Sequence, residues 1–539
     1  MIPDRLSAPG WVSTEANPIK GLDLLGLRLS GQNIGNSLLD GVTTITPSVR
    51  YLSLRCWLAN AYIQARRPDE WRSFRAFADR VEAAIAFGNL LINPQAVGVI
   101  GHDRARERLK AKPRSLALEQ LVKQPAVNIY GSPSEDLGLA FSADSGLPGL
   151  TRERGIPLAA TVAAHLSRSK LGRQLGAGQD VKSASVADLT EFGELAQVDN
   201  IPDKERRLLA EVLVPPEPRK GEWPRFSTYA LLLHLAGRLK RLPNDEDLFL
   251  AASRPRGSDY PAELGNIVDG WLRYGVRDLL AVAHEMVVAA VIDELAAATN
   301  EGKAAAKPAS ILRSLLGRER EHNEALRSFG LLRRGERYRG LSLAQLKTRV
   351  QGQMSKKRTE EAGLRRWAGE LQDFNLIKRL LSAGAESLVL LPVAWFIAVD
   401  RTEVGIDMGI GGFDALDVGG WGRIGVNTVI RPAIESLIQR DASLPQAMAE
   451  LALRSVEQHL RIAWTRLAQD PRRDVAVLLE DEGYWRYKAR LEAGRTASRL
   501  TQAVSWLWQL ELVDEAGLSP AGHEVLDRAL AGLRSRGAE

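Results

Sequence analysis

The segment from Ala262 to Ala298 restricts the fold more than any other part of the chain. Its apolar residues recur with helical spacing, and the stretch LLAVAHEMVVAAVIDELAAA is apolar on nearly every side. A helix without a polar face has to be surrounded by other elements of the protein. We therefore expect a central core helix here, with further helices packed around it.

Helical periodicity and start signals predict shorter helices along most of the chain. Thr46-Pro47-Ser48 precedes an apolar pattern that runs to Arg66, and a second pattern follows from Pro68 to Asn93. Because their connection is short, these two helices are expected to form an antiparallel hairpin. Other helices are expected at 157–169, 185–197, 202–213, 226–239, 426–439, 444–469 and 474–492, with short strands between 93 and 155. The predicted fold class is mainly α, a multi-helical protein with a small C-terminal α+β module.

Breaks in composition suggest four consecutive regions. The proline-rich stretch VPPEPRKGEWP at 214–224 separates two helical parts, and a Gly- and Asp-rich passage from Asp400 to Gly425 is the least regular part of the chain. The predicted regions are an N-terminal helical region with a loop-rich insert (1–215), a central helical region that is basic from 313 (225–385), a region with an apolar core element, the Gly/Asp-rich loop and helices (386–494), and a C-terminal module (495–539).

Composition excludes several classes of protein. With 539 residues, 45% hydrophobic and 26% charged, the chain is neither disordered nor fibrous. The single cysteine, Cys56, excludes an intramolecular disulfide and a cysteine-based zinc site. The apolar stretch from Ser387 to Val399 contains Pro392 and is shorter than the roughly 20 residues of a membrane helix. It is interpreted as a buried core element, for which a strand is one option. The start of the chain has no signal-peptide pattern, and we expect a cytoplasmic bacterial protein without a membrane partner.

Positive charge is concentrated in the middle of the chain. The net charge is +6, yet residues 313–379 contain 17 Lys or Arg against 8 Asp or Glu. Such a concentration is expected where a surface attracts phosphates. The alternative is an exposed, solvated face in which glutamates pair locally with these cations. The candidate nucleic-acid-binding residues are Arg333, Arg334, Arg337, Arg339, Lys356, Lys357, Arg358, Arg365 and Arg366.

The C-terminal segment RTASRLTQAVSWLWQLELVDEAGLSPAGHEVLDRAL predicts a helix, a tight turn at 514–517 between two short extended pieces, and a second helix that begins at Pro520. This order resembles the end of a winged-helix domain, in which a recognition helix enters the major groove and a hairpin wing touches the backbone. The resemblance covers about 40 residues, and the turn here is short and acidic. It implies a DNA-reading outward face that carries Arg495, Ser498, Arg499, Gln502, Ser505 and Gln509. Winged helices also mediate protein contacts.

Catalytic motifs fail on inspection. His284-Glu285 begins like a zinc-protease motif, but Val288 stands where the second histidine is required. The glycines from Gly420 to Gly425 fit a dinucleotide-binding spacing without the surrounding alternation of strands and helices. No phosphate-binding loop of the G-x-x-x-x-G-K-[ST] type is present. We predict no catalytic residue, no metal and no cofactor.

One acidic passage keeps an enzymatic alternative open. Carboxylates on loops suit Mg²⁺ and thus phosphodiester hydrolysis, with Lys488, Lys378 or Arg379 as electrostatic helpers. The carboxylates concerned are Asp400, Glu403, Asp407, Asp414 and Asp417. Asp and Gly together are also the ordinary composition of surface turns.

The function expected from the sequence is binding. We predict a non-enzymatic accessory subunit of a bacterial nucleic-acid-handling assembly, with antiphage defence as one context, that contacts nucleic acid, DNA in the first place, and other protein subunits. The alternatives are a divergent Mg²⁺-dependent nuclease that uses the acidic passage and a pure protein scaffold.

Overall fold

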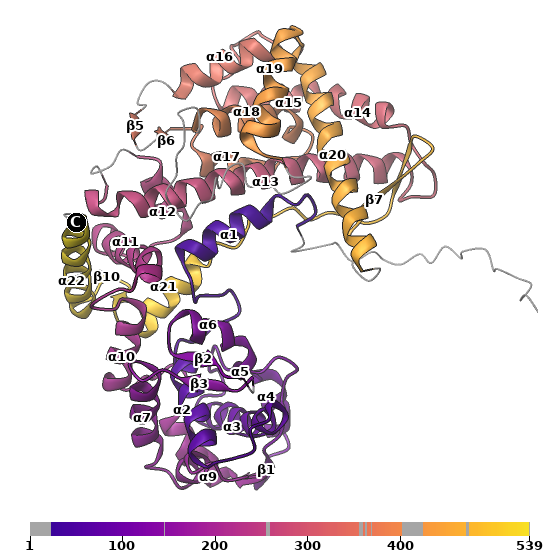
Figure 1. The fold of residues 1–539 in the computed structure, drawn as a ribbon. Helices are drawn as coiled ribbons and strands as arrows, with labels where there is room; N and C mark the ends of the chain where they lie inside the picture. The colour runs from indigo at the N-terminus through magenta and orange to yellow at the C-terminus, as the bar shows by residue number, and fades with distance from the viewer. Residues whose placement is uncertain are drawn as a thin grey trace, which may run out of the picture. The chain divides into compact units, whose positions relative to one another are not determined.

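The computed structural model describes residues 23–144, 146–254, 259–354, 359–361, 364–367, 369–401, 424–470 and 474–537. Within these residues the chain is mainly helical, with 22 α-helices and five two-stranded antiparallel sheets (Figure 1). This confirms the predicted fold class. Across this described part, no helix is both long enough and apolar enough to span a lipid bilayer.

The chain divides into two compact units, each assembled from separate segments. Unit 1 comprises residues 1–34, 249–259 and 269–496, and unit 2 comprises residues 35–248, 260–268 and 497–539. The regions expected from the sequence are consecutive, whereas each compact unit combines segments from different parts of the chain. Three helices have residues in both units: α1 (Arg28–Leu38), α12 (Asp245–Ala252) and α13 (Gly265–Ala298).

Unit 2 contains the N-terminal helices and the C-terminal module. Its elements are α2 (Arg50–Gln64), α3 (Trp71–Ile92), α4 (His102–Leu109), β1 (Ser115–Ala117), α5 (Ala126–Ile129), α6 (Gly131–Asp136), β2 (Ala140–Ser142), β3 (Pro148–Leu150), α7 (Gly155–Leu166), α8 (Lys170–Gly176), β4 (Ser183–Ser185), α9 (Val186–Leu195), α10 (Asp203–Leu213), η1 (Lys220–Glu222), α11 (Trp223–Leu239), η2 (Ala262–Leu264), α21 (Leu500–Gln509), β9 (Val513–Asp514), β10 (Gly517–Leu518) and α22 (Pro520–Gly537).

Long-range packing dominates the core of unit 2. Helices α2 and α3 touch each other, as the expected hairpin requires, but α2 packs mainly on α7 and α3 mainly on α9 (Figure 1). Gly88 of α3 and Gly193 of α9 allow this approach. A Cβ at Gly88 would lie 2.8 Å from the Cα of Gly193, a distance that forces the backbones apart. Two glycines separated by about a hundred residues thus set the spacing of two helices.

A buried ion pair ties α2 to α10 inside unit 2. The side chains of Arg50 and Glu205 are both fully buried, and the guanidinium lies 3.1 Å from the carboxylate. Arg50 also donates to the carbonyl groups of Leu195 and Asn200 at 2.9 Å. Because every charge here has partners, the pair tolerates burial.

Unit 1 contains the central part of the chain. Besides α1, α12 and α13 its elements are α14 (Pro308–Gly317), α15 (Glu319–Ser328), η3 (Tyr338–Gly340), α16 (Leu343–Met354), β5 (Thr359–Glu361), β6 (Leu364–Arg366), α17 (Asp373–Leu381), α18 (Ser387–Arg401), the π-helical turn η5 (Val426–Ile430), α19 (Arg431–Gln439), α20 (Leu444–Gln469), β7 (Leu478–Asp481) and β8 (Tyr484–Tyr487).

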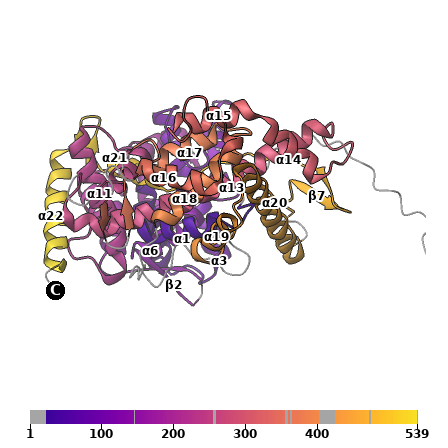
Figure 2. The same ribbon diagram turned by 90° about the horizontal axis from the view of Figure 1, so that it is seen from above.

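Three helices meet at one hydrogen-bonded junction in the core of unit 1. The indole N–H of Trp395 on α18 donates to Nε2 of His284 on α13 at 2.9 Å, and Nδ1 of His284 lies 2.8 Å from Oγ of Ser455 on α20. Ser455 donates its own hydroxyl proton to the carbonyl of Leu451. Nδ1 therefore carries the imidazole proton and donates it to Ser455. The expected central helix is confirmed as α13, and both views place it beside α18 (Figures 1 and 2).

Two expectations for unit 1 are corrected or completed by the structure. The apolar stretch from 387 is a helix, α18, in which every residue from Ser387 to Arg401 is buried. The helix expected at 474–492 is wrong, because residues 478–487 form the β7–β8 hairpin. Glu482 and Gly483 both have positive φ, at 51° and 76°. Two such residues form the tight turn that matches the twist of paired strands, and Trp485 of β8 is buried.

The C-terminal module has the expected order of elements. Helix α21 is followed by the β9–β10 hairpin and by α22, which begins at Pro520. The turn is closed by the N–H of Ala516, which donates to the Asp514 carboxylate at 2.8 Å. Ser519 caps α22, accepting a hydrogen bond from the N–H of Gly522 at 3.0 Å. The module is a helix, a small hairpin and a helix, loosely compatible with the end of a winged-helix domain.

Candidate nucleic-acid interface

The segment from Arg327 to Arg339, here called the arginine loop, presents a dense group of exposed cations. It connects α15 to η3 in unit 1 and contains five arginines and one glutamate. Arg333, Arg334, Arg337 and Arg339 are all exposed. Among the described residues, no carboxylate forms an ion pair with the side chain of Arg333 or Arg334. These two guanidinium groups are therefore open to an external anion.

Alternating apolar residues hold the arginine loop in place. Leu331 and Leu332 are buried in the core of unit 1 immediately before the exposed arginine pair. Tyr338 is buried between Arg337 and Arg339, and its hydroxyl donates to the carbonyl of Leu316 at the end of α14. Its backbone N–H donates to the side chain of Asn323 at 2.8 Å. With both ends fixed, the arginines project from an ordered scaffold and lose less conformational freedom on binding.

The one glutamate of the loop is occupied by an internal partner. Glu336 accepts a two-pronged contact from Arg349 on α16, at 2.6 and 3.0 Å, and a backbone hydrogen bond from Arg333. These contacts lower the pKa of Glu336 to about 2. Glu319 lies 3.6 Å from Arg337 and 3.7 Å from Arg339, so one carboxylate serves two arginines. The surface keeps a local excess of positive charge.

The second part of the predicted basic stretch has a different role. Arg366 is fully buried; it pairs with Asp269 of α13 and donates to the carbonyl of Ala252 at 2.6 Å. Arg365 is only 14% exposed and donates to Asp400 at 3.1 Å. These contacts lie inside unit 1, so neither arginine faces solvent as a phosphate contact requires. The exposed face is therefore smaller than the charge count indicates. Lys356, Lys357 and Arg358 lie outside the described residues.

The face of α21 that the winged-helix resemblance assigned to DNA is covered by the chain itself. Arg499 donates to the carbonyl of Val42 at 2.7 Å, and both Gln502 and Gln509 donate to the carbonyl of Pro47. The indole N–H of Trp506 donates to the carbonyl of Thr46 at 3.0 Å. The expectation of an outward face is wrong, because residues 42–49 supply backbone acceptors that the sequence pattern of the helix does not reveal.

Arg495 also has an internal role. It lies before α21 and belongs to unit 1, where its guanidinium donates to the buried carboxylate of Asp278 at 2.9 Å. The same group lies over the rings of Phe249 and Phe374, 5.2 and 5.0 Å from their centres. Burial raises the pKa of Asp278, and Arg495 opposes that shift. The residue stabilises the interior of unit 1.

The described residues give no support to a metal site. Within them, no three His, Cys, Asp or Glu side chains are placed to hold a metal ion. Asp400 is the one member of the acidic passage that the structure describes, and it is buried against Arg365. Glu403, Asp407, Asp414 and Asp417 fall outside the described residues. Of the suggested helper cations, Lys488 pairs with Asp474 and Arg379 with Glu386, while Lys378 lies over the ring of Phe374.

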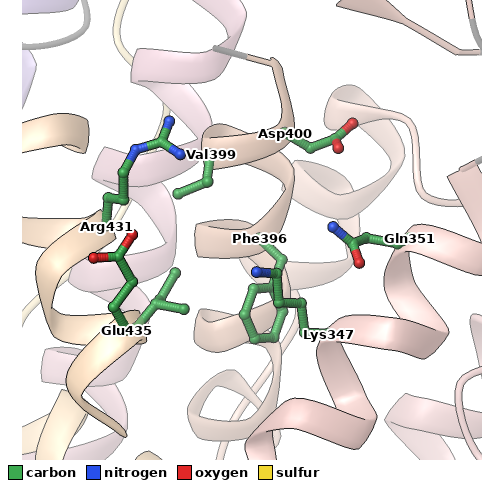
Figure 3. A pocket seen from close by; sticks show the side chains of 8 residues that line it. Lys347, Gln351, Phe396, Val399, Asp400, Arg431 and Glu435 are labelled. Atoms are coloured by element: carbon green, nitrogen blue, oxygen red, sulfur yellow. The ribbon is translucent and has the colours of Figure 1, made fainter. Parts of the chain in front are cut away.

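A small pocket beside Asp400 has both signs of charge around an apolar floor (Figure 3). The ammonium group of Lys347 points to its centre above Phe396, while the side chains of Arg431 and Glu435 enter from α19. The pocket offers about 90 Å³, enough for a few water molecules and less than organic ligands require. Its lining includes no Ser, Cys or His, and its charged groups are those of Lys347, Asp400, Arg431 and Glu435.

The histidine of the failed zinc motif is part of the core. His284 is completely buried at the three-helix junction, and burial lowers its pKa to about 3. Glu285 accepts a two-pronged contact from Arg28 of α1. Both residues are thus held by internal partners, in agreement with the rejection of the motif.

Comparison with known proteins adds no identification: no family model, no curated protein and no solved structure matches the chain.

Proposed function

We propose that the chain is a nucleic-acid-binding protein that holds the phosphate backbone with the arginine loop. The observation that carries this proposal is the pair Arg333 and Arg334, exposed on an anchored loop while the adjacent Glu336 is occupied by Arg349. Guanidinium groups bind phosphate oxygens through two parallel hydrogen bonds and remain charged at any physiological pH. The role is binding, as an accessory subunit, with DNA as the first ligand to test.

The proposal depends on phosphate contacts and not on base reading. The described loop provides four exposed arginines within seven residues, from Arg333 to Arg339. It is not a helix whose side chains would enter the major groove. Contacts to phosphates position a protein on nucleic acid without selecting its sequence. We therefore expect weak sequence preference and strong dependence on salt.

The experiment is a titration of a labelled 30-base-pair duplex at 50 and 200 mM salt, followed by fluorescence anisotropy. If the four arginines each neutralise one phosphate, the affinity falls about 150-fold between the two salt concentrations. In the double variant Arg333→Gln, Arg334→Gln, the affinity should fall only about 12-fold between the same two salt concentrations.

The matched control is Arg104→Gln with Arg106→Gln, which removes the same two charges from exposed positions of α4 in unit 2. It is expected to keep the salt dependence of the unmodified protein. Absence of binding at 50 mM salt, or equal losses in the two double variants, rules out the arginine loop as the site. A single-stranded oligonucleotide in the same titration separates duplex from single-strand binding.

A further inference from the structure

A second surface of unit 1 has the opposite character. Between α14 and α20 runs an open groove of about 530 Å³ whose lining is mostly apolar. Pro308, Leu312 and Leu316 line it from α14, and Ala449 and Leu453 line it from α20. The two helices pack on each other along the floor of the groove. Leu316 and Leu453 are only partly buried, although each packs against the core.

The apolar stripe on α20 continues beyond the groove. Ala449, Leu453, Leu460 and Trp464 follow one face of this helix, at spacings of four, seven and four residues. Trp464 is 70% exposed and Leu460 partly buried. At 1.5 Å per residue, the stripe is about 22 Å long, the length of a helix of about four turns. An exposed tryptophan that extends an apolar groove marks an interaction surface.

Positive charge borders this groove. Arg313 of α14 is exposed and has no ion-pair partner among the described residues. Arg339 lies at the C-terminal end of α14, where it donates to the carbonyl of Leu316 at 2.8 Å and lies 3.7 Å from the carboxylate of Glu319.

One carboxylate of α20 near the groove is already balanced by cations. Glu450 of α20 pairs with Arg440 and Arg454. Glu457 stands between Arg454 and Arg461 at helical spacing on the same helix. The rim is therefore left with a positive charge that an incoming anionic group neutralises.

We propose that this groove binds an amphipathic helix of a partner protein that is apolar on one face and acidic along its flanks. Apolar side chains of the partner, three and four residues apart, enter the groove between Leu312, Leu316 and Leu453. Its carboxylates pair with Arg313. The proposal gives the partner-binding part of the proposed function a location, and its test does not depend on nucleic-acid binding.

The experiment measures the anisotropy of a labelled 16-residue designed peptide added to the full chain. The peptide carries leucines at helical spacing and glutamates on both flanks, and its twin carries lysine at each glutamate position. We expect the acidic peptide to bind with a Kd on the order of 10 µM and the basic twin to bind about tenfold more weakly. Arg313→Glu and Leu453→Asp should each weaken the acidic peptide about tenfold.

Matched controls exclude general effects of charge and folding. Leu381→Asp changes an exposed leucine elsewhere in unit 1, and Arg320→Glu reverses another exposed arginine; both variants should bind the peptide as the unmodified protein does. Leu453→Asp should bind DNA normally, which separates this proposal from the preceding one. The proposal fails if the two peptides bind equally or if Leu453→Asp binds as well as Leu381→Asp. It also fails if sedimentation shows self-association that Leu453→Asp abolishes, because a second copy would then be the occupant.

Discussion

Two arginine-rich parts of unit 1 use the same side chain in opposite ways. In the arginine loop, Arg333 and Arg334 are exposed and open to an external anion. Farther along the chain, Arg366 and Arg401 are fully buried, and each is paired with a buried aspartate. Local charge density in a sequence therefore does not reveal whether a surface or an interior is charged.

The carboxylate partners account for this difference. Arg366 meets Asp269 from α13, almost a hundred residues earlier in the chain, and Arg401 meets Asp373 from α17. Arg401 also lies over the ring of Trp367, with its guanidinium carbon 3.3 Å from the ring centre. Among the described residues, Glu319 is the carboxylate that pairs with arginines of the loop, because Glu336 pairs with Arg349 of α16. A buried arginine requires a carboxylate partner and closely packed neighbours. Arg366 and Arg401 have both, and Arg333 and Arg334 do not.

The largest expected effect comes from breaking a buried pair. Arg401→Met keeps much of the volume of the side chain but leaves the buried carboxylate of Asp373 without its cation, which typically costs about 3–5 kcal/mol. Urea unfolding followed by circular dichroism measures the change. Arg333→Met should change the free energy of unfolding by less than about 0.5 kcal/mol. Similar losses of unfolding free energy in Arg401→Met and Arg333→Met would contradict the difference between the buried and the exposed arginines.

A pH titration tests burial through a group that changes charge. The pKa of His284 is lowered to about 3 in the folded protein and has its ordinary value near 6.5 in the unfolded chain. Below pH 6.5 the imidazole of His284 is protonated in the unfolded chain but stays neutral in the folded protein. The free energy of unfolding therefore decreases as the pH falls toward 3. The slope it contributes is about 1.4 kcal/mol per pH unit.

The measurement compares urea unfolding of the unmodified protein and of His284→Gln at pH 6.5, 5.5 and 4.5. Glutamine has both a donor and an acceptor for Ser455 and Trp395, and the variant should lose this part of the pH dependence. Identical slopes would show that the imidazole is protonated in the fold. If the variant does not fold, the ring resonances of His284 in the unmodified protein serve instead, and they should not titrate above pH 4.

The smallest expected effect concerns the exposed arginine loop. Glu336→Gln removes the one negative charge of the arginine loop and should tighten duplex binding about two- to threefold at 50 mM salt. The effect should fade at 200 mM salt because solvent ions screen exposed charges. Glu324→Gln, on α15, is the control and should change binding less. A weaker affinity for Glu336→Gln would mean that its pairing with Arg349 shapes the loop.

Local signals in the sequence predicted much of the secondary structure. The bounds of α20 agree with the predicted 444–469, because Ser443 and Gln446 cap each other's backbone groups and Pro445 suits the first turn. The order of helix, hairpin and helix after Leu500 was also predicted from the sequence. The expected helix at 474–492 failed because apolar spacing outweighed the Glu482-Gly483 turn signal.

The candidate site was only half predictable. The structure places Arg333, Arg334, Arg337 and Arg339 on the surface, as a binding role requires, and that role stays a prediction. The burial of Arg366 and the covering of Gln502 and Gln509 depend on Asp269 and on residues 42–49, which lie far away in sequence. The groove between α14 and α20 depends likewise on two helices more than a hundred residues apart. Contacts between residues so far apart in sequence can be seen only in the folded structure.

The junction of His284, Trp395 and Ser455 has a consequence for biosynthesis. Ser455 follows His284 by 171 residues, so a ribosome that adds 5–20 residues per second needs roughly 10–30 s to complete the set. During that interval the apolar stretch of α13 has been synthesised without the helix that covers it. A nascent chain of this kind is a natural client for chaperones that shield apolar segments, and truncation before residue 455 should leave an aggregating product.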